Sequence, residues 1–253
     1  MIEEKNILNQ EVVLEIKDLN KSFGDNHVLN GFNMKLFQGE NLVVMGKSGS
    51  GKSVMIKCLI GLMEADSGTI SVMHQDITKL NQKALDILRG DIGFLFQGSA
   101  LYDSMTVREN LEFPLRRSLK KNGEYIDKDE LIKEALNNVG LLSAIDLMPS
   151  ELSGGMKRRI ALARTLILKP KIILYDEPTS GLDPITAKEI IILMEDIQKR
   201  EGTSSLIITH DVDCARVVSD RMILLIDGID YATGSFQELS TSMDPKIKAF
   251  FKH

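Results

Sequence analysis

The chain has 253 residues, of which 43% are hydrophobic and 26% charged, and its formal net charge at pH 7 is −5. The length allows one large domain, or two only if both are small, and the composition is that of a globular protein with a sizeable core. It excludes a disordered chain, a collagen-like fibre and a disulfide scaffold. The negative charge gives no global basic field for nucleic acid, and no apolar run is long enough to span a membrane. Cys58 and Cys214 lack C-x-x-C spacing, which favours a reducing compartment. The polar N-terminus has no secretion core, so we expect a cytoplasmic protein.

The first part of the chain is predicted to consist mainly of β-strands. Short apolar or β-branched runs alternate with polar turns at Gly24-Asp25-Asn26 and Gln38-Gly39-Glu40. Strands are expected at 12–16, 28–36, 41–46 and, more weakly, 68–73. A helix is expected from Lys52 to about Leu62. The nearly all-apolar run 92–97 predicts a strand that is buried on both faces.

From about Thr106 to Arg200 the apolar residues recur mostly with helical spacing, which predicts a helical middle section. Breaks in the helices are expected at Pro114, in the polar stretch 120–129 and at Met148-Pro149, because proline and polar turn residues end helices.

One helix of this section is indicated by a stripe of apolar residues at i, i+4, i+7 and i+11, namely Met156, Ile160, Ala163 and Ile167. The basic cluster Lys157-Arg158-Arg159 is expected on a solvated face of it. Further apolar strands at 172–176, 205–209 and 221–227 are separated by helices, which predicts a mainly parallel sheet covered on both faces. We expect one compact domain over 12–245, a helical insertion near 98–160 and a short tail at 246–253.

The stretch from Gly46 to Ser53, GKSGSGKS, follows a predicted strand and opens a predicted helix, and it fits the phosphate-loop pattern G-x-x-x-x-G-K-S. Glycines let backbone N–H groups approach phosphates, and the helix N-terminus adds positive potential. Lys52 can reach the β- and γ-phosphates, and the Ser53 hydroxyl can ligate Mg²⁺. A glycine-rich turn that merely begins a helix is the simpler alternative, and a dinucleotide site is disfavoured because G-x-G-x-x-G is not matched. The candidate nucleotide-binding residues are Gly46, Ser48, Gly49, Ser50, Gly51, Lys52 and Ser53.

A second candidate element is the apolar strand 172–176, which ends in the acids Asp176 and Glu177. Delivered to a phosphate loop, Asp176 can hold Mg²⁺, usually through water, and Glu177 can orient or deprotonate an attacking water molecule. A polar turn would explain Asp-Glu-Pro on its own. The phosphate loop earlier in the same chain favours the catalytic interpretation.

Further short motifs follow in a fixed order: Gln97, Leu152-Ser153-Gly154-Gly155-Met156, Tyr175-Asp176-Glu177-Pro178, Ser180-Gly181-Leu182-Asp183 and His210. With the phosphate loop, the set resembles the ATP-binding-cassette (ABC) ATPases over residues 12–245. The resemblance implies an α/β fold, namely a P-loop NTPase (RecA-like) core with a small antiparallel β subdomain and a helical insertion. It also implies an ATPase that uses ATP and Mg²⁺ and powers a transporter from the cytoplasmic face of the inner membrane, bound there peripherally.

In such ATPases two cassettes sandwich two ATP molecules head to tail. The resemblance therefore implies a homodimer of cassettes in which Ser153, Gly154 and Gly155 bind the γ-phosphate held by the other copy. Asp183 would bridge the two sites. Gln97 would sense the γ-phosphate and Mg²⁺ and link that state to the helical insertion.

The resemblance gives roles to other residues as well. His210 would position γ-phosphate and water beside Glu177, although a structural histidine is the simpler interpretation of His210 alone. Phe23 stands where such cassettes carry an aromatic residue, more often tyrosine, that stacks on adenine; a packed strand residue is the alternative. Met156 stands where many cassettes have glutamine, which leaves the contacts of Ser153 and its glycines unchanged.

A closer resemblance, to the Mla-type ATPases, rests on three stretches: Leu95–Leu115, Met148–Met156 and Asp244–Phe251. Those ATPases serve MCE-protein systems, which move phospholipids or other lipids between membranes of the bacterial envelope. The resemblance implies lipid transport, with integral-membrane permease subunits and an MCE-domain lipid-binding protein as partners. The segment after Gln97 is where such a cassette receives the coupling helix of its permease. Some Mla-type ATPases have a longer C-terminal extension that contacts the second ATPase subunit, so neither such dimer contacts nor a small regulatory subunit bound nearby is assumed for this chain.

Two alternatives stay open from the sequence. The same fold could serve another substrate, such as an amino acid, a drug or a lipoprotein. A soluble cassette protein acting on DNA or ribosomes is disfavoured because the chain has one motif set, no heptad run and a negative net charge. We therefore expect no nucleic-acid partner.

Overall fold

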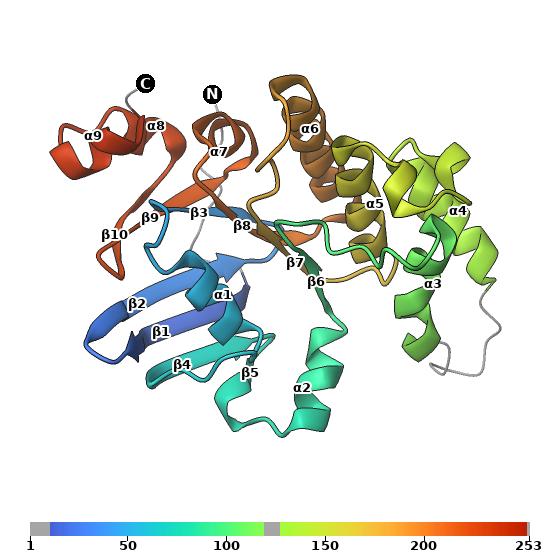
Figure 1. Ribbon diagram of the computed structural model, residues 1–253. Coiled ribbons are helices and arrows are strands. Elements are labelled where there is room, and N and C mark those ends of the chain that lie inside the picture. The colour runs from blue at the N-terminus through green and yellow to red at the C-terminus, as the bar shows by residue number, and fades with distance from the viewer. Residues whose placement is uncertain (1–10, 119–126, 252–253) are drawn as a thin grey trace.

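The computed structural model describes residues 11–118 and 127–251. Most of the predicted break at 120–129 therefore lies outside the described residues, as do the last two residues of the tail 246–253. Figure 1 shows two β-sheets that lie close together, with helices α3, α4 and α5 gathered to one side of them.

The smaller sheet is antiparallel and comes from the N-terminal part of the chain, as the fold class predicted. In sheet order its strands are β2 (Asn26–Phe37), β1 (Val12–Phe23), β4 (Ser67–Val72) and β5 (Gln75–Asp76). The strands β1 and β2 extend beyond their apolar runs, because backbone pairing continues through polar residues as far as Phe23 opposite Asn26. Strand length therefore exceeds what the apolar pattern predicted.

The larger sheet is the parallel sheet predicted from the alternation of strands and helices. In sheet order its strands are β10 (Ile229–Gly234), β9 (Arg221–Ile226), β3 (Asn41–Met45), β8 (Ser204–Thr209), β7 (Ile172–Asp176) and β6 (Ile92–Leu95). All neighbours pair in parallel except β9 and β10. Because β3, β7 and β8 are adjacent and parallel, the segments that follow them emerge at one edge of the sheet.

Helices cover both faces of the parallel sheet. Helix α1 (Lys52–Leu59) lies between the two sheets, since its apolar residues share a core with β1, β2 and β4 and with one face of the parallel sheet. On the opposite face pack α6 (Pro184–Glu201), α7 (Val212–Val218), α8 (Phe236–Ser240) and α9 (Pro245–Phe251). Short 3₁₀ turns occur at Ile77–Lys79, Leu142–Ala144 and Pro149–Glu151.

A third core forms between α3 (Val107–Ser118), α4 (Lys128–Asn138) and α5 (Gly154–Leu166). The predicted apolar stripe is confirmed, because Ile160, Ala163 and Ile167 belong to this core and the partly buried Met156 packs against it. The expected break at Pro114 is wrong, since α3 runs through this residue. Proline removes one backbone donor, but Leu111 and Leu115 on either side of it are buried, and their packing keeps the helix continuous.

Two further details differ from the sequence predictions. Strand β6 is an edge strand with alternating burial, not a strand buried on both faces: Gly93 and Leu95 are buried, while Phe94 is only partly covered. Helix α2 (Gln82–Arg89) was not predicted. It is capped by Asn81, whose side chain accepts a hydrogen bond from the backbone N–H of Ala84.

Two general features of the described residues are the burial of both thiols and the lack of a membrane-spanning helix. Both cysteines are buried, and burial raises the pKa of each thiol. Among the described helices, none is both long and apolar enough to cross a bilayer.

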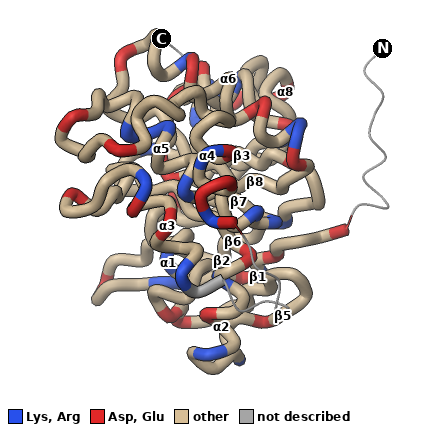
Figure 2. Tube along the Cα trace, turned by 90° about the vertical axis from the view of Figure 1, so that its right-hand side faces the viewer, with Lys and Arg blue, Asp and Glu red and all other residues tan. Residues whose placement is uncertain are grey.

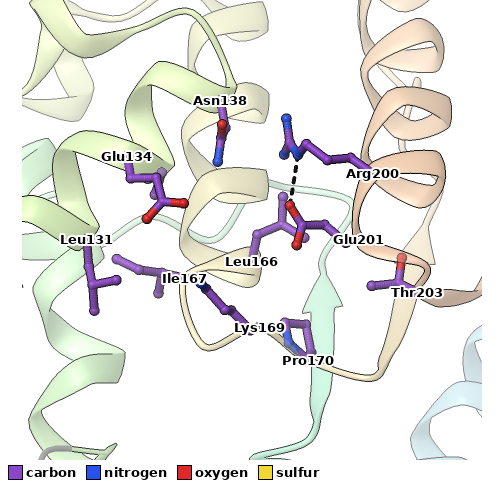
Figure 3. A pocket seen from close by; sticks show the side chains of 11 residues that line it. Leu131, Glu134, Asn138, Leu166, Ile167, Lys169, Pro170, Arg200, Glu201 and Thr203 are labelled. Atoms are coloured by element: carbon purple, nitrogen blue, oxygen red, sulfur yellow. Dashed lines mark hydrogen bonds and ion pairs between the residues drawn. The ribbon is translucent and has the colours of Figure 1, made fainter. Parts of the chain in front are cut away.

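A cavity of about 100 Å³ lies where α4 meets the C-terminal ends of α5 and α6 (Figure 3), lined by residues such as Asn138, Lys169 and Arg200. None of the candidate nucleotide-binding residues lines this cavity.

Candidate functional site

The phosphate-loop sequence forms a tight turn between β3 and α1. Strand β3 is buried along its whole length, and it delivers Gly46 to the start of the turn. Gly51 has φ of 103°, and a Cβ there would lie 2.8 Å from the carbonyl oxygen of Val28, so only glycine fits this position. Gly51 also caps α1 without a side-chain hydrogen bond. The first N–H groups of α1 therefore have no side-chain partner at the cap and can bind an anion.

Lys52 lies folded back into this turn. Its side chain is buried, and Nζ donates to the carbonyl oxygens of Gly46 at 2.7 Å and Lys47 at 2.9 Å. Burial lowers the pKa of Lys52, and the nearby carboxylates of Glu177 and Asp176 partly offset this effect. An ammonium group with only carbonyl hydrogen-bond partners in a turn of backbone N–H groups is suited to bind phosphate.

The other loop residues lie at the surface or beside it. Ser48, Gly49 and Ser53 are exposed, and Gly49 has φ of 80°. Ser50 is partly covered, and its hydroxyl is buried without a hydrogen-bond partner. The exposed Ser53 hydroxyl is available to a ligand.

Asp176 ends β7 and Glu177 follows it, and both acids lie close to Lys52, since each carboxylate raises the lysine pKa. Burial raises the pKa of Asp176, and the Glu177 charge adds to the rise, while Lys52 and Arg158 oppose it. Glu177 is only 8% exposed and has a left-handed backbone with φ of 49°, a conformation that costs energy for a residue other than glycine. Its N–H donates to the carbonyl oxygen of Ile208 at 2.8 Å, which ties this turn to β8.

His210 directly follows β8, the neighbour of β7, and the structure pairs it with Glu177. The carboxylate oxygen Oε2 of Glu177 lies 2.8 Å from His210 Nδ1 and accepts from the His210 backbone N–H at 3.3 Å. The His210 ring is 66% exposed, whereas the Glu177 side chain is 11% exposed. A buried carboxylate held by an exposed imidazole can orient and deprotonate a water molecule that enters from solvent.

Gln97 follows β6, and its side chain reaches the segment after β7. Its Nε2 donates to Ser180 Oγ at 3.2 Å. The backbone carbonyl of Gln97 also accepts a hydrogen bond of 2.5 Å from Arg158 Nη2. The structure thus brings together Gln97 and the turn that carries the two acids.

The candidate signature residues form the start of α5. Ser153 caps the helix, and its hydroxyl accepts from the backbone N–H of Met156 at 3.2 Å. A Cβ at Gly155 would lie 2.5 Å from Thr186 Cγ2, so this glycine is also needed for packing between α5 and α6. Gly154 is exposed. Among the described residues, none of Ser153, Gly154 and Gly155 hydrogen-bonds to the loop 46–53 of the same chain.

Asp183 and Phe23 lie at two further places on the surface. The Asp183 carboxylate caps α6 by accepting from the backbone N–H groups of Ile185 and Thr186, each at 3.1 Å, and hydrogen bonds led by that of the Thr186 hydroxyl lower its pKa. Phe23 ends β1 and is 49% exposed, with Lys21 Nζ 5.6 Å from the ring centre. It is therefore not a packed core residue, and its ring is available for stacking.

A Mg²⁺ ion would need ligands beyond the protein side chains at this site. The described residues contain no group of three or more His, Cys, Asp and Glu side chains that could enclose a metal. The exposed Ser53 hydroxyl and the Asp176 carboxylate are oxygen donors of the kind that Mg²⁺ uses when substrate phosphates and water complete its coordination.

Arg158 is the residue that the sequence interpretation missed. It was expected on a solvated helix face, but it is only 2% exposed, and it binds the backbone of Phe96, Gln97 and Ser180. Helix α5 buries a second side beyond its apolar stripe, on which Arg158 lies one turn from the buried Leu162. The i, i+4 spacing of these two residues was the available signal.

These features place the chain in a known class. The family model described as "ABC transporter" matches residues 29–180, and the chain belongs to this family. It is an ATP-binding subunit of the ABC type, an enzyme that hydrolyses ATP, and its α/β fold is that of the ABC cassettes.

Three curated relatives illustrate the similarity. The methionine import ATP-binding protein MetN of Clostridium tetani is 41% identical over 85% of this chain and 67% of its own length. The probable ribonucleotide transport ATP-binding protein mkl of Mycobacterium leprae is 40% identical over 94% of this chain and 68% of its own. The chloroplastic protein TRIGALACTOSYLDIACYLGLYCEROL 3 of Arabidopsis thaliana is 37% identical over 99% of this chain and 76% of its own.

Solved structures agree with the fold. The ATP-binding cassette MJ0796, in a dimeric post-hydrolysis state with ADP and Pi, matches with a TM-score of 0.79 and 31% identity, over 88% of this chain and 98% of that one. The protein cbiO1 of Clostridium perfringens, part of an ABC transporter complex, matches with a TM-score of 0.81 and 29% identity over 90% of each chain.

Proposed function

We propose that this chain hydrolyses Mg²⁺-ATP between two copies of itself and so drives the transport of phospholipid or another lipid. The observation that carries the hydrolytic part is the buried Glu177 carboxylate, paired with His210 at 2.8 Å and close to Lys52 of the phosphate loop. A base, an ammonium group and a ring of backbone N–H groups thus meet at one edge of the parallel sheet.

The nucleotide would be held from both ends. The exposed ring of Phe23 stacks on the adenine, and the backbone of residues 46, 48, 49, 50 and 51 surrounds the phosphates, with Lys52 on the β- and γ-phosphates. Ser53, Asp176 and Gln97 are the residues that would hold Mg²⁺. The ion, when bound, neutralises charge on the β- and γ-phosphate oxygens.

The chain's own residues then act on the attacking water. Glu177 accepts its proton, and burial keeps this carboxylate in a fixed position. His210 holds the carboxylate and presents an exposed ring toward γ-phosphate and water. Lys52 stabilises the charge that develops on the transferred phosphoryl group.

The second copy would complete the site. Ser153 and the N–H groups of Gly154 and Gly155 lie at a helix N-terminus that makes no hydrogen bond to the phosphate loop of its own chain among the described residues. They would bind the γ-phosphate of the partner's ATP. Asp183, at the start of α6, would bridge the two sites. We propose that residues 12–245 act as one such domain, with the helical part near 98–160 and the tail 246–253 attached.

The surface beyond Gln97 supports contact with a permease. Tyr102 and Phe113 are 43% and 40% exposed, and their ring centres are 4.8 Å apart. Exposed aromatic pairs are typical of interface cores. This position would place the chain at the cytoplasmic face of the inner membrane, bound peripherally. In the view of Figure 2, basic and acidic residues are mixed along the trace, which favours a protein partner over nucleic acid.

The lipid substrate and an MCE-domain partner are the finer part of the proposal. Support comes from the resemblance of segments 95–115, 148–156 and 244–251 to the Mla-type ATPases, and from the Arabidopsis relative, which bears the name of a diacylglycerol lipid and aligns over 99% of this chain. The relatives named for methionine and ribonucleotide transport favour the alternative of another substrate.

A pull-down from native membranes in mild detergent tests the proposal. We expect an MCE-domain protein, a multi-span permease and phospholipid to purify with the chain. The variant Phe113→Asp should lose these partners and keep ATP binding, whereas Ile87→Asp, at a more exposed apolar position on α2, should keep both. Recovery of a different permease without lipid would refute the substrate, and recovery of no membrane protein would refute the transporter role.

A further inference from the structure

The buried side chain of Arg158, on helix α5, hydrogen-bonds to two other segments of the chain. Its Nη1 donates to the Phe96 carbonyl oxygen at 2.6 Å, and Nη2 donates to the carbonyl oxygens of Gln97 at 2.5 Å and Ser180 at 3.4 Å. The Gln97 side chain closes the group, because its Nε2 donates to Ser180 Oγ at 3.2 Å. The segment after β6, the segment after β7 and α5 therefore meet at one guanidinium group.

This arrangement is costly for a side chain with a purely structural role. Arg158 is 2% exposed, takes part in no ion pair among the described residues, and has a buried Nε without a hydrogen-bond partner. Burial accordingly lowers its pKa, although the nearby Asp176 carboxylate opposes that effect. A buried charge held only by carbonyl oxygens stabilises a fold less well than an apolar side chain of similar size would. What the guanidinium does provide is a planar fork that fixes several acceptors at once.

We propose that Arg158 is a positioning residue that fixes Gln97 relative to Ser180 and α5, so that Gln97 moves together with the helices α3–α5. This inference rests on the proposed role of Gln97 toward the γ-phosphate and Mg²⁺. Arg158 is buried and hydrogen-bonds to backbone carbonyl groups, so it acts through the backbone of Gln97 and Ser180.

The position of Arg158 along α5 gives this link a direction. Ser153, at the start of the same helix, lies five residues earlier, which is about 8 Å along the helix axis. If Ser153 binds the partner's ATP, α5 moves on binding. Arg158 moves with α5, and its hydrogen bonds shift Gln97 and the turn that holds Glu177 in the same direction. One rigid helix would thus connect the two nucleotides of the dimer.

The test uses the full chain and measures the affinity for a non-hydrolysable ATP analogue in excess EDTA and in excess Mg²⁺. The ratio of the two affinities reports the Mg²⁺-dependent gain without turnover. The variants are Arg158→Gln, Arg158→Lys and Gln97→Ala. The matched control is Arg159→Gln, because the Arg159 guanidinium binds Glu189 Oε2 at 2.5 Å and the Val139 carbonyl but no residue of the site. Thermal melting establishes that each variant is folded.

We expect Arg158→Gln to reduce the Mg²⁺-dependent gain about tenfold and to leave the affinity in EDTA within about twofold, since misplacement of a ligand by about 1 Å costs up to 10²-fold. Gln97→Ala should show the same loss, and the double variant should be no weaker than Gln97→Ala alone. Arg158→Lys should lose part of the gain, because an ammonium group cannot reproduce the fork. Arg159→Gln should match the natural protein.

The outcomes separate the inference from the proposed function. If Gln97→Ala loses no Mg²⁺-dependent affinity, the proposed role of Gln97 fails, and with it any role of Arg158 through Gln97. If Gln97→Ala loses affinity but Arg158→Gln does not, or if the two losses multiply, the positioning role alone is refuted. Should Arg158→Gln fail to fold, Arg158→Lys decides, since a gain equal to that of the natural protein would also overturn the inference.

Discussion

Replacing Glu177 by glutamine removes the proposed base with little change in shape. The Glu177 side chain is 11% exposed and lies 2.8 Å from His210 Nδ1. A glutamine carboxamide of the same size can keep this contact through its oxygen, but it cannot accept a proton from water. The variant Glu177→Gln should therefore fold and bind ATP as the natural protein does.

The expected loss of turnover follows from the role of a positioned base. General base catalysis contributes about 10²–10⁴-fold in rate. The fall in kcat should lie in this range, which corresponds to about 3–5 kcal/mol of transition-state stabilisation. Lys52 keeps its contacts with Gly46 and Lys47, so the affinity for ATP should change by less than about threefold.

The assay is phosphate release at saturating Mg²⁺-ATP, with binding of a fluorescent ATP analogue measured in parallel. Glu195→Gln is the control, because the partly exposed Glu195 has an ion pair with Lys199 at 3.5 Å on α6 and, within the described part of the chain, no contact with the site. An unchanged kcat in Glu177→Gln would remove Glu177 from its role as base. An equal loss of ATP binding would show that the side chain acts in the ground state instead.

Further predictions concern Ser153 at the proposed contact with the second copy, the proposed Mg²⁺ ligand Asp176, and Phe23 at the proposed adenine site. Ser153→Arg should abolish hydrolysis but keep ATP binding by the single chain, and surviving hydrolysis would refute the head-to-tail arrangement. Because burial raises the pKa of Asp176, its ionised form destabilises the fold at neutral pH. Asp176→Asn should therefore raise the melting temperature at pH 7. This gain should vanish as the pH falls through the raised pKa, since the natural carboxyl group is then also neutral. Phe23→Ala should weaken ATP binding about 3–10-fold, whereas Phe23→Tyr should not, as titration with ATP would measure.

The sequence predicted those parts of the fold that depend on local pattern. Strands β3, β7 and β8 lie in the middle of the sheet, where burial on both faces produces a continuous apolar run. Strand β6 has the same apolar character but lies at the edge, and edge position depends on strand order, which no local pattern encodes. The course of α3 through Pro114 was missed for a related reason, since tertiary packing outweighed the local preference of proline.

The motifs and the resemblance named the candidate site residues, and the structure adds the contacts between them. The resemblance implied that His210 lies beside Glu177, and their contact at 2.8 Å exists because β7 and β8 are adjacent in the sheet. The contacts of Gln97 with Ser180 and Arg158 were not predicted. Arg158 was assigned to solvent because charge usually lies at the surface. Its burial depends on α5 packing between the third core and the segment after β6, a three-dimensional arrangement that a charge pattern cannot show.

The burial of both native thiols has a practical use. Cys58 and Cys214 are 2% and 0% exposed, and their raised pKa values keep them protonated and unreactive toward maleimide dyes. A single cysteine introduced at Met243, which is 82% exposed, could therefore be labelled selectively without removing either native residue. Energy transfer between two such labels would follow the approach and separation of two copies in real time during ATP turnover.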